Sequence, residues 1–107
     1  MEKLLFGNIV LLRFPFTDGK KDKKRPALIL RDSDDGDVIV CRITSKLYHT
    51  EFDFKIEDWK KCGLRLPSII RLHKLASLDI SIVDQKIGVI NDNIQKQIKD
   101  KFADLLK

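Results

Sequence analysis

Arg25 is the residue of this sequence that first points to chemistry, because it combines a permanent charge with a basic neighbourhood and a constrained backbone. From Asp18 to Arg25 there are five basic residues against two acidic ones, and Gly19 adds backbone freedom. Pro26 follows directly and favours an extended conformation at Arg25. A guanidinium held in this way matches two phosphate oxygens at once. The segment therefore favours binding of a phosphodiester.

Hydroxyl and imidazole groups supply the next candidates. Thr44 and Ser45 end an apolar run, where their hydroxyls could bind phosphate oxygens, although a Thr-Ser pair at the end of a strand is usually part of a turn. His49 and His73 could serve as base and acid, because the pKa of histidine lies near neutrality. His73 follows Arg71 by two residues in a predicted strand, so we expect these two side chains to be neighbours on one face.

The stretch 8–14 is the central element that must position these groups. It is apolar on both faces, with Val10 and Leu12 on one and Ile9 and Leu11 on the other. Such a strand needs cover on both sides. A small barrel covers one side, and a helix or a second subunit must cover the other. The pattern therefore supports a homodimer.

Alternating apolar residues and intervening turns predict the other elements. The further strands span residues 27–31, 38–44, 52–56, 68–77 and 84–88, with residues 32–37 as the turn of a hairpin. In the strand 52–56, Asp53 should point outward. Residues 57–63 begin with acids and end on a glycine, which predicts one helical turn with a partly exposed Cys62. Asn91 should cap an amphipathic C-terminal helix.

The composition indicates a soluble and basic domain. The 107 residues are 43% hydrophobic and 35% charged, so we expect one domain over residues 1–107 with its own core. The net charge of +5 and a sequence pI of about 9.3 favour a polyanionic partner, although many small basic proteins bind no nucleic acid. Neither the two cysteines nor the acidic turn matches a metal-binding pattern, and no apolar stretch could span a membrane. We expect a cytoplasmic protein without metal or cofactor.

Six short pieces of the sequence follow one another in a distinctive order. They are Gly7-Asn8-Ile9-Val10, Phe14-Pro15-Phe16-Thr17-Asp18-Gly19, Lys24-Arg25-Pro26-Ala27-Leu28-Ile29-Leu30, Ile43-Thr44-Ser45, Gly63-Leu64 with Pro67-Ser68, and Ile87-Gly88-Val89-Ile90. In these pieces, which cover nearly the whole chain, the sequence resembles the PemK or MazF toxins of type II toxin–antitoxin pairs. It departs from them at Asn8, where the family usually carries an acid.

The resemblance implies a fold, an activity and partners. The fold would be mainly β, an SH3-like barrel of the PemK/MazF/CcdB type with short helices and a C-terminal amphipathic helix, assembled as a homodimer. The activity would be sequence-specific, metal-independent cleavage of single-stranded RNA through the 2′-hydroxyl of the substrate. The partners would be messenger RNA and a cognate antitoxin, whose acidic segment folds on binding.

The residues and the resemblance together assign roles. Arg25 would stabilise the charge of the transition state, and the family suggests a further role for it as general acid. Thr44 matches the catalytic threonine or serine of the family. The predicted RNA-binding residues are Lys20, Lys21, Lys23, Lys24, Ser45, Arg71 and His73. Base stacking would rest on Tyr48 or on a phenylalanine near a loop.

Three alternatives stay open at this point. In the first, one of His49 and His73 is the general base of the cleavage and the other is the general acid. In the second, the same fold acts on a protein target, as the related gyrase-poisoning toxins do, and Arg25 is structural. In the third, the chain is an RNA-binding module without catalysis. Incubation of the protein with RNA separates the last two from a ribonuclease.

Overall fold

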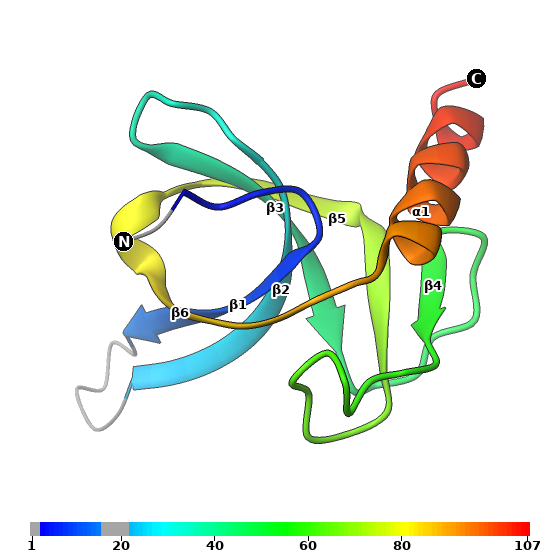
Figure 1. Cartoon of the computed structure of the whole chain (residues 1–107), viewed down its shortest axis with the longest axis horizontal. Helices are drawn as coiled ribbons and strands as arrows, with labels where there is room; N and C mark the ends of the chain where they lie inside the picture. Colours follow the sequence, from blue (N-terminus) through cyan, green and yellow to red (C-terminus); the bar gives the residue numbers. More distant parts are fainter. Residues whose placement is uncertain (1–2, 16–21) are drawn as a thin grey trace.

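One antiparallel sheet of six strands carries the fold, in the spatial order β4-β5-β3-β2-β1-β6 (Figure 1). The computed structural model describes residues 3–15 and 22–107. Its elements are β1 (Asn8–Pro15), β2 (Asp22–Asp32), β3 (Asp37–Thr44), β4 (Asp53–Ile56), β5 (Ser68–Asp79), the short 3-10 helix η1 (Ile80–Ile82), β6 (Val83–Val89) and α1 (Asp92–Leu105). In Figure 1 the sheet curls round on itself, and α1 lies beside β4. The prediction of a mainly β, barrel-like fold with a C-terminal helix is confirmed, although the edge strands β4 and β6 do not pair to close the barrel.

β2 begins at Asp22 and not at residue 27, as the sequence pattern predicted. The three basic residues before Pro26 therefore lie in a strand. Their partners in β1 are Leu12 for Arg25, Arg13 for Lys24 and Phe14 for Lys23. Pairing with an apolar strand outweighs the weak strand preference of these charged residues. The predicted extended backbone at Arg25 is confirmed, whereas the predicted basic loop is shorter than expected and its remainder lies outside the described residues.

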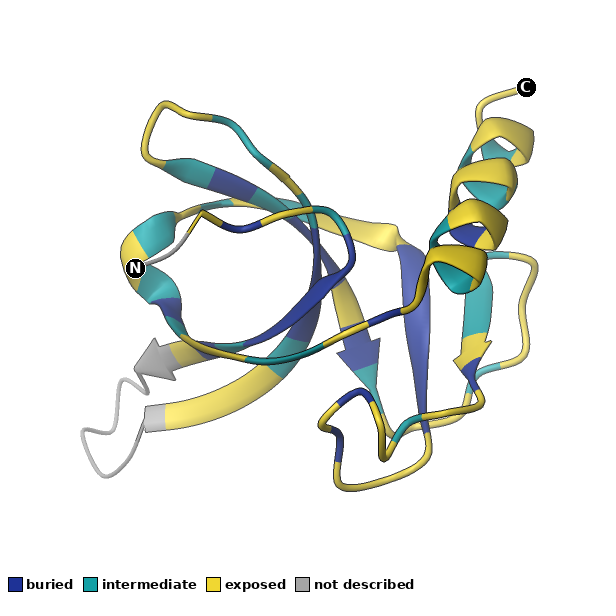
Figure 2. Cartoon of the chain, in the orientation of Figure 1, coloured by how far each residue is buried: buried dark blue, intermediate teal, exposed yellow. Residues whose placement is uncertain are grey.

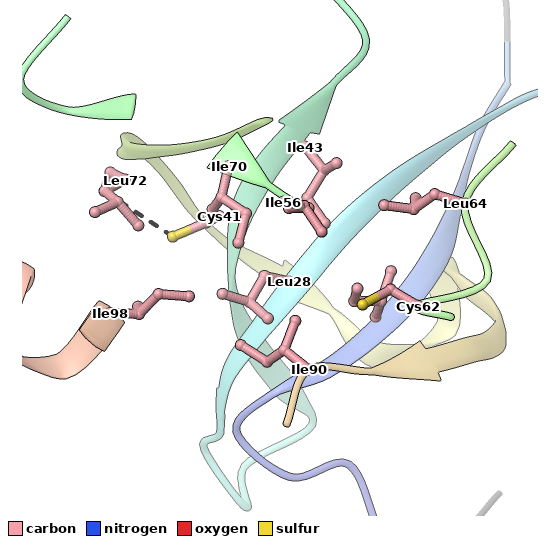
Figure 3. Close-up of a cluster of buried hydrophobic side chains, with 11 residues drawn as sticks. Leu28, Cys41, Ile43, Ile56, Cys62, Leu64, Ile70, Leu72, Ile90 and Ile98 are labelled. Atoms are coloured by element: carbon pink, nitrogen blue, oxygen red, sulfur yellow. Dashed lines mark hydrogen bonds between the residues drawn. The ribbon is translucent and has the colours of Figure 1, made fainter. Parts of the chain in front are cut away.

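β1 separates two hydrophobic clusters. Ile9 belongs to the larger cluster, part of which is drawn in Figure 3, and side chains of α1 and Trp59 pack against that cluster. Val10 and Leu12 belong to the smaller cluster, which Ile80 of η1 helps to cover. All three β1 residues are at most 4% exposed. Of the two predicted covers, a helix or a second subunit, the helix is confirmed, because side chains of α1 pack against the cluster that contains Ile9. The homodimer itself stays a prediction.

The segment between β4 and β5 packs its backbone directly against β6. Residues 57–63 form turns, and the backbone N–H of Cys62 donates a 3.1 Å hydrogen bond to the carbonyl oxygen of Asp58, which closes the single helical turn that was predicted. Gly63 has the positive φ of +82° that the predicted C-terminal glycine requires. A Cβ atom at Gly63 would overlap the carbonyl oxygen of Ile87, and one at Gly88 would overlap that of Cys62. Because of this close approach Cys62 is buried, in contrast to the partial exposure that was expected.

The C-terminal helix follows the predicted pattern. The Oδ1 atom of Asn91 accepts a hydrogen bond of 2.9 Å from the backbone N–H of Ile94, which confirms the predicted cap. Ile98 is fully buried in the larger cluster. Lys101 Nζ donates a hydrogen bond of 2.9 Å to the backbone oxygen of Asp53 and so ties α1 to β4.

Asn8, the position at which the chain departs from the family pattern, has a local structural role. Its side chain is buried, and its Oδ1 atom accepts a 2.9 Å hydrogen bond from the backbone N–H of Leu5. Its own N–H donates to the carbonyl oxygen of Leu5 at 3.0 Å. A carboxylate could accept the same bond, so the amide keeps the turn and removes a charge from a buried position.

Candidate nucleic-acid interface

β2 and β3 separate at Pro26. The pairing between these strands ends with Ala27 opposite Arg42. Pro26 has no N–H with which to continue the ladder, and β2 runs on paired with β1 alone. If the register of β2 and β3 were continued by two residues, Arg25 would stand opposite Thr44. The two residues predicted to be catalytic therefore lie on the two sides of the opening between these strands.

A surface groove of about 790 Å³ occupies this opening. In Figure 2, exposed residues near the start of β2 and the largely exposed segment between β4 and β5 lie on either side of the end of β3. The basic residues that line the groove are Lys23, Lys24, Arg25, Arg42, Arg65 and Lys74. Apolar side chains such as Pro26, Leu64 and Leu66 line it as well, and none of its described lining residues is acidic. A ligand with a negative backbone and flat apolar groups would match both parts of this surface.

Three arginines of the groove have no acidic partner among residues 3–15 and 22–107. They are Arg25, Arg42 and Arg65. Lys24 differs, because its Nζ lies 3.0 Å from Asp84, whose other oxygen binds Arg13 Nη2 at 2.6 Å. The hydrogen bond from Lys24 and the charges of Lys24 and Arg13 lower the pKa of Asp84. The single carboxylate of Asp84 therefore offsets only part of the charge of Lys24 and Arg13, whereas the three arginines have no such partner in the described part of the chain.

Thr44 and Ser45 form the end of the β3 wall. The Oγ1 atom of Thr44 accepts a 3.1 Å hydrogen bond from the backbone N–H of Lys46, which is the turn chemistry expected for this pair. Because a hydroxyl both accepts and donates, the Thr44 proton can still be given to a bound oxygen atom. Ser45 is exposed and also lines the groove.

Arg71 lies outside the groove in a buried network. Its Nε atom donates to Asp53 Oδ1 at 2.9 Å, and the two side chains are only 10% and 3% exposed. Thr50 donates its N–H and its hydroxyl to Asp53 Oδ2 at 2.9 and 2.7 Å. Burial alone would raise the pKa of Asp53, but the hydrogen bonds from Thr50 and Arg71 outweigh it and lower that pKa. The expectation that Asp53 points outward is wrong, because its carboxylate neutralises Arg71.

The two histidines are also separate from the groove. The ring of His73 packs on the ring of Phe52 with centroids 4.5 Å apart, and its side chain is exposed while Arg71 is buried. The pairing of β5 with β3 is irregular between Leu75 and Arg71, which breaks the simple alternation that predicted a shared face. His49 is exposed and does not line the groove.

The sequence thus identified part of the groove. Of the predicted site residues, those that line it are Lys23, Lys24, Arg25, Thr44 and Ser45, those that do not are Arg71 and His73, and those outside the described residues are Lys20 and Lys21. RNA contact by any of them stays a prediction. Three lining cations were missed. Arg42 alternates with Thr44 along β3, which is a usable signal, whereas Arg65 and Lys74 are brought in by tertiary structure.

None of the described lining residues of the groove is a histidine, cysteine, aspartate or glutamate. Among the described residues, no three side chains of His, Cys, Asp or Glu gather in a way that could hold a metal ion. Cys41 and Cys62 are free and buried, and burial raises the pKa of Cys41 to about 12. Within the same part of the chain, no helix is long and apolar enough to cross a membrane.

The chain is similar to several solved toxin structures. It aligns with a MazE–MazF complex from Deinococcus radiodurans at 21% identity and a TM-score of 0.75, over 99% of this chain and 97% of that chain. It aligns with an endoribonuclease in complex with its cognate antitoxin, from a mycobacterial species, at 14% identity and a TM-score of 0.75, over 96% and 94% of the two chains. It also aligns with the toxin MazF-mt6 of Mycobacterium tuberculosis at 16% identity and a TM-score of 0.70, over 89% of this chain and 93% of that chain.

These structures share the fold at identities too low to transfer an activity. No curated protein matches the chain. A family model does match it, over residues 6–106, and that model describes the PemK-like, MazF-like toxins of type II toxin–antitoxin systems. Because the match covers nearly the whole sequence and agrees with the shared fold, the chain belongs to the PemK-like, MazF-like toxin family.

Proposed function

We propose that this toxin is an endoribonuclease that cuts single-stranded RNA in a sequence-specific and metal-independent manner, and that an antitoxin restrains it. One observation carries the proposal. Arg25 and Thr44 stand on the two sides of the opening between β2 and β3, in a groove whose described lining has six cations and no acid. Two solved proteins of the same fold, at 14% and 15% identity, are endoribonucleases.

The chemistry needs little from the protein, because RNA contains its own nucleophile. The 2′-oxygen attacks the neighbouring phosphorus, the bond from phosphorus to the 5′-oxygen breaks, and the products are a cyclic phosphate and a 5′-hydroxyl. A proton leaves the 2′-hydroxyl and another reaches the departing oxygen. The enzyme must align these atoms and stabilise the extra negative charge on the phosphorane-like transition state.

Arg25 and Thr44 divide this work. Arg25 binds two phosphate oxygens with its planar guanidinium and stabilises the developing charge, and its permanent protonation makes proton transfer a lesser task for it. Thr44 donates its hydroxyl proton to a phosphate oxygen or orients the 2′-hydroxyl. Lys23, Lys24 and Ser45 hold the backbone on both sides of the cut. The apolar lining next to them favours a single strand, because only unpaired bases can reach it.

The same groove is the binding site that we assign to the antitoxin. An acidic segment with apolar anchors would pair with the unpartnered arginines and cover Leu64 and Leu66. Binding would then exclude RNA from the groove, and the segment would order only on contact. An antitoxin that bound without reducing RNA binding would contradict this competitive picture. We further propose a homodimer, which sedimentation at micromolar concentration would detect.

Incubation of the purified protein with a long RNA tests the proposal. We expect cuts at a recurring short sequence, with cyclic-phosphate ends, and the same pattern in the presence of a chelator. Binding without cutting would instead support an RNA-binding module. Absence of both would favour a protein target. Cutting that stops when a chelator is added would contradict metal independence.

A further inference from the structure

Tyr48 is the aromatic side chain that the Arg71 network supports. Its ring covers the guanidinium of Arg71, with Cζ 3.6 Å from the ring centroid. Such contact between a guanidinium and an aromatic face is favourable and fixes the plane of the ring. The buried pairing of Arg71 with Asp53, and of Asp53 with Thr50, anchors both ends of this arrangement. A side chain in a surface loop therefore rests on a guanidinium that is itself buried and paired.

The loop that carries Tyr48 continues the groove wall. It follows Thr44 and Ser45 directly in the chain, and both of these residues line the groove. Arg42, another lining residue, lies opposite Arg71 in the pairing of β3 with β5. Tyr48 is not itself a described lining residue, but it rests on Arg71, whose strand partner Arg42 does line the groove, so the ring lies at the edge of the groove. The side chain is only half-buried, although one of its faces is covered by a guanidinium.

We infer that Tyr48 is a stacking platform for one base of the bound RNA, and that Arg71 with Asp53 positions this platform without touching the RNA. The inference rests on the proposed function, because it names how the same groove reads its substrate. Unpaired bases are commonly stacked on aromatic side chains, and a rigid ring loses little entropy when a base binds. Lys46 Nζ also lies over the Tyr48 ring, 5.1 Å from its centroid, and this cation would attract the phosphate next to a stacked base.

The positioning role of Arg71 follows from its neighbours. Asp53 already holds its charge, and the ring of Tyr48 covers its guanidinium plane. Arg42, Arg65 and Arg25 have neither kind of partner among the described residues. A phosphate contact should therefore appear in the salt dependence of binding for these three arginines and not for Arg71.

The binding test uses random-sequence single-stranded RNA with 2′-O-methyl groups throughout, which lacks the nucleophile and cannot be cut. Tyr48→Leu should weaken binding about tenfold, the usual size of one stacked base, and leave the salt dependence unchanged. Tyr48→Phe should bind within about twofold of the unmodified protein, because the ring is kept. His49→Ala changes the next residue of the loop and serves as the matched control. Arg65→Ala should reduce the slope of log affinity against log salt by about 0.7.

A spectroscopic reading identifies the stack itself. RNA that contains 2-aminopurine should lose fluorescence on binding to the unmodified protein and to Tyr48→Phe, and should lose much less on binding to Tyr48→Leu. Binding and quenching by a folded Tyr48→Leu that equal those of the unmodified protein would overturn the platform while leaving the ribonuclease intact. An unmodified protein that binds no RNA would overturn both.

Arg71→Lys tests the positioning role, because it keeps a positive charge for Asp53 and removes only the flat support of the ring. We expect about threefold weaker binding in the otherwise unmodified protein and no further loss in the Tyr48→Leu background. Thermal melting of each variant checks that it is folded. Equal losses in both backgrounds would show that Arg71 contacts RNA directly, and no loss in either would show that it does not position Tyr48.

Discussion

Arginines at two places in this molecule have the same charge and opposite surroundings. Arg71 is buried, bonded to Asp53 at 2.9 Å and covered by Tyr48. Arg25, Arg42 and Arg65 line an open groove and have no acidic partner in the described part of the chain. Because Asp53 already balances the charge of Arg71, Arg71 attracts a further anion only weakly. The three groove arginines are therefore the ones available to a polyanion.

The comparison also separates stability from function. The buried pair is expensive to break, because removal of one partner leaves the other charged and without a partner away from water. An unpartnered surface arginine stabilises the fold little, so its loss should cost activity and leave the protein folded. Variants of the buried pair should therefore lose stability in unfolding assays, and variants of the groove arginines should lose activity in cleavage assays.

Asp53→Ala should give the largest effect, on stability. We expect the free energy of unfolding to fall by about 3 kcal/mol. This value is at the low end for a broken buried pair, because the pair lies directly below the partly exposed ring of Tyr48. Denaturant titration measures it. The control is Asp100→Ala, which breaks an exposed pair with Lys96 in α1 and should leave stability almost unchanged. Equal losses in the two variants would remove the distinction between the buried and exposed sites.

Arg25→Ala should give the largest effect on activity. We expect cleavage to slow by about a hundredfold or more, as when an oxyanion-hole donor is removed, with the melting temperature unchanged. Arg25→Lys should recover little, because a point charge cannot match two oxygens. Arg31→Ala, an exposed arginine of the same strand outside the groove, is the matched control and should cleave normally. Full activity in Arg25→Ala would remove Arg25 from the site.

Thr44→Ala should slow turnover by about tenfold, the range for loss of one hydrogen bond to a charged group. Thr44→Ser keeps the hydroxyl and should retain most activity. Single-turnover kinetics with excess protein separate this change from a change in binding. A loss shared by both variants would show that Thr44 acts through its methyl group and packing.

Acid should weaken the buried site in a predictable direction. The pKa of Asp53 is lowered in the folded protein, so the unfolded chain takes up this proton first as the pH falls. The stabilisation by Asp53 is complete above the ordinary carboxyl pKa of about 4 and is lost as the pH falls through the lower folded value. Asp53→Asn should therefore flatten the acid side of the stability profile. Asp100→Asn should leave that profile parallel to the original, and a parallel profile in Asp53→Asn would contradict the assignment.

Local patterns in the sequence predicted the elements and some of the site. The alternation in β3 and the cap at Asn91 act over a few residues, so they could be read directly. The family order pointed to Arg25 and Thr44. The early start of β2 depends on its partner strand, and the turn of Asp53 toward Arg71 depends on a residue 18 positions away. Arg65 and Lys74 reach the groove only through tertiary packing, for which one sequence carries no local signal.

The most direct test of the central claim replaces one ribose by deoxyribose immediately before a mapped cut. If the 2′-hydroxyl is the nucleophile in this groove, cleavage at that bond should stop, while binding of the RNA and cleavage at unmodified sites continue. Cleavage of the deoxy-substituted bond at the normal rate would contradict the account. It would then favour a water nucleophile over the 2′-hydroxyl chemistry assigned to Arg25 and Thr44. Proton transfer by His49 and His73 to and from the same 2′-hydroxyl nucleophile would be blocked equally.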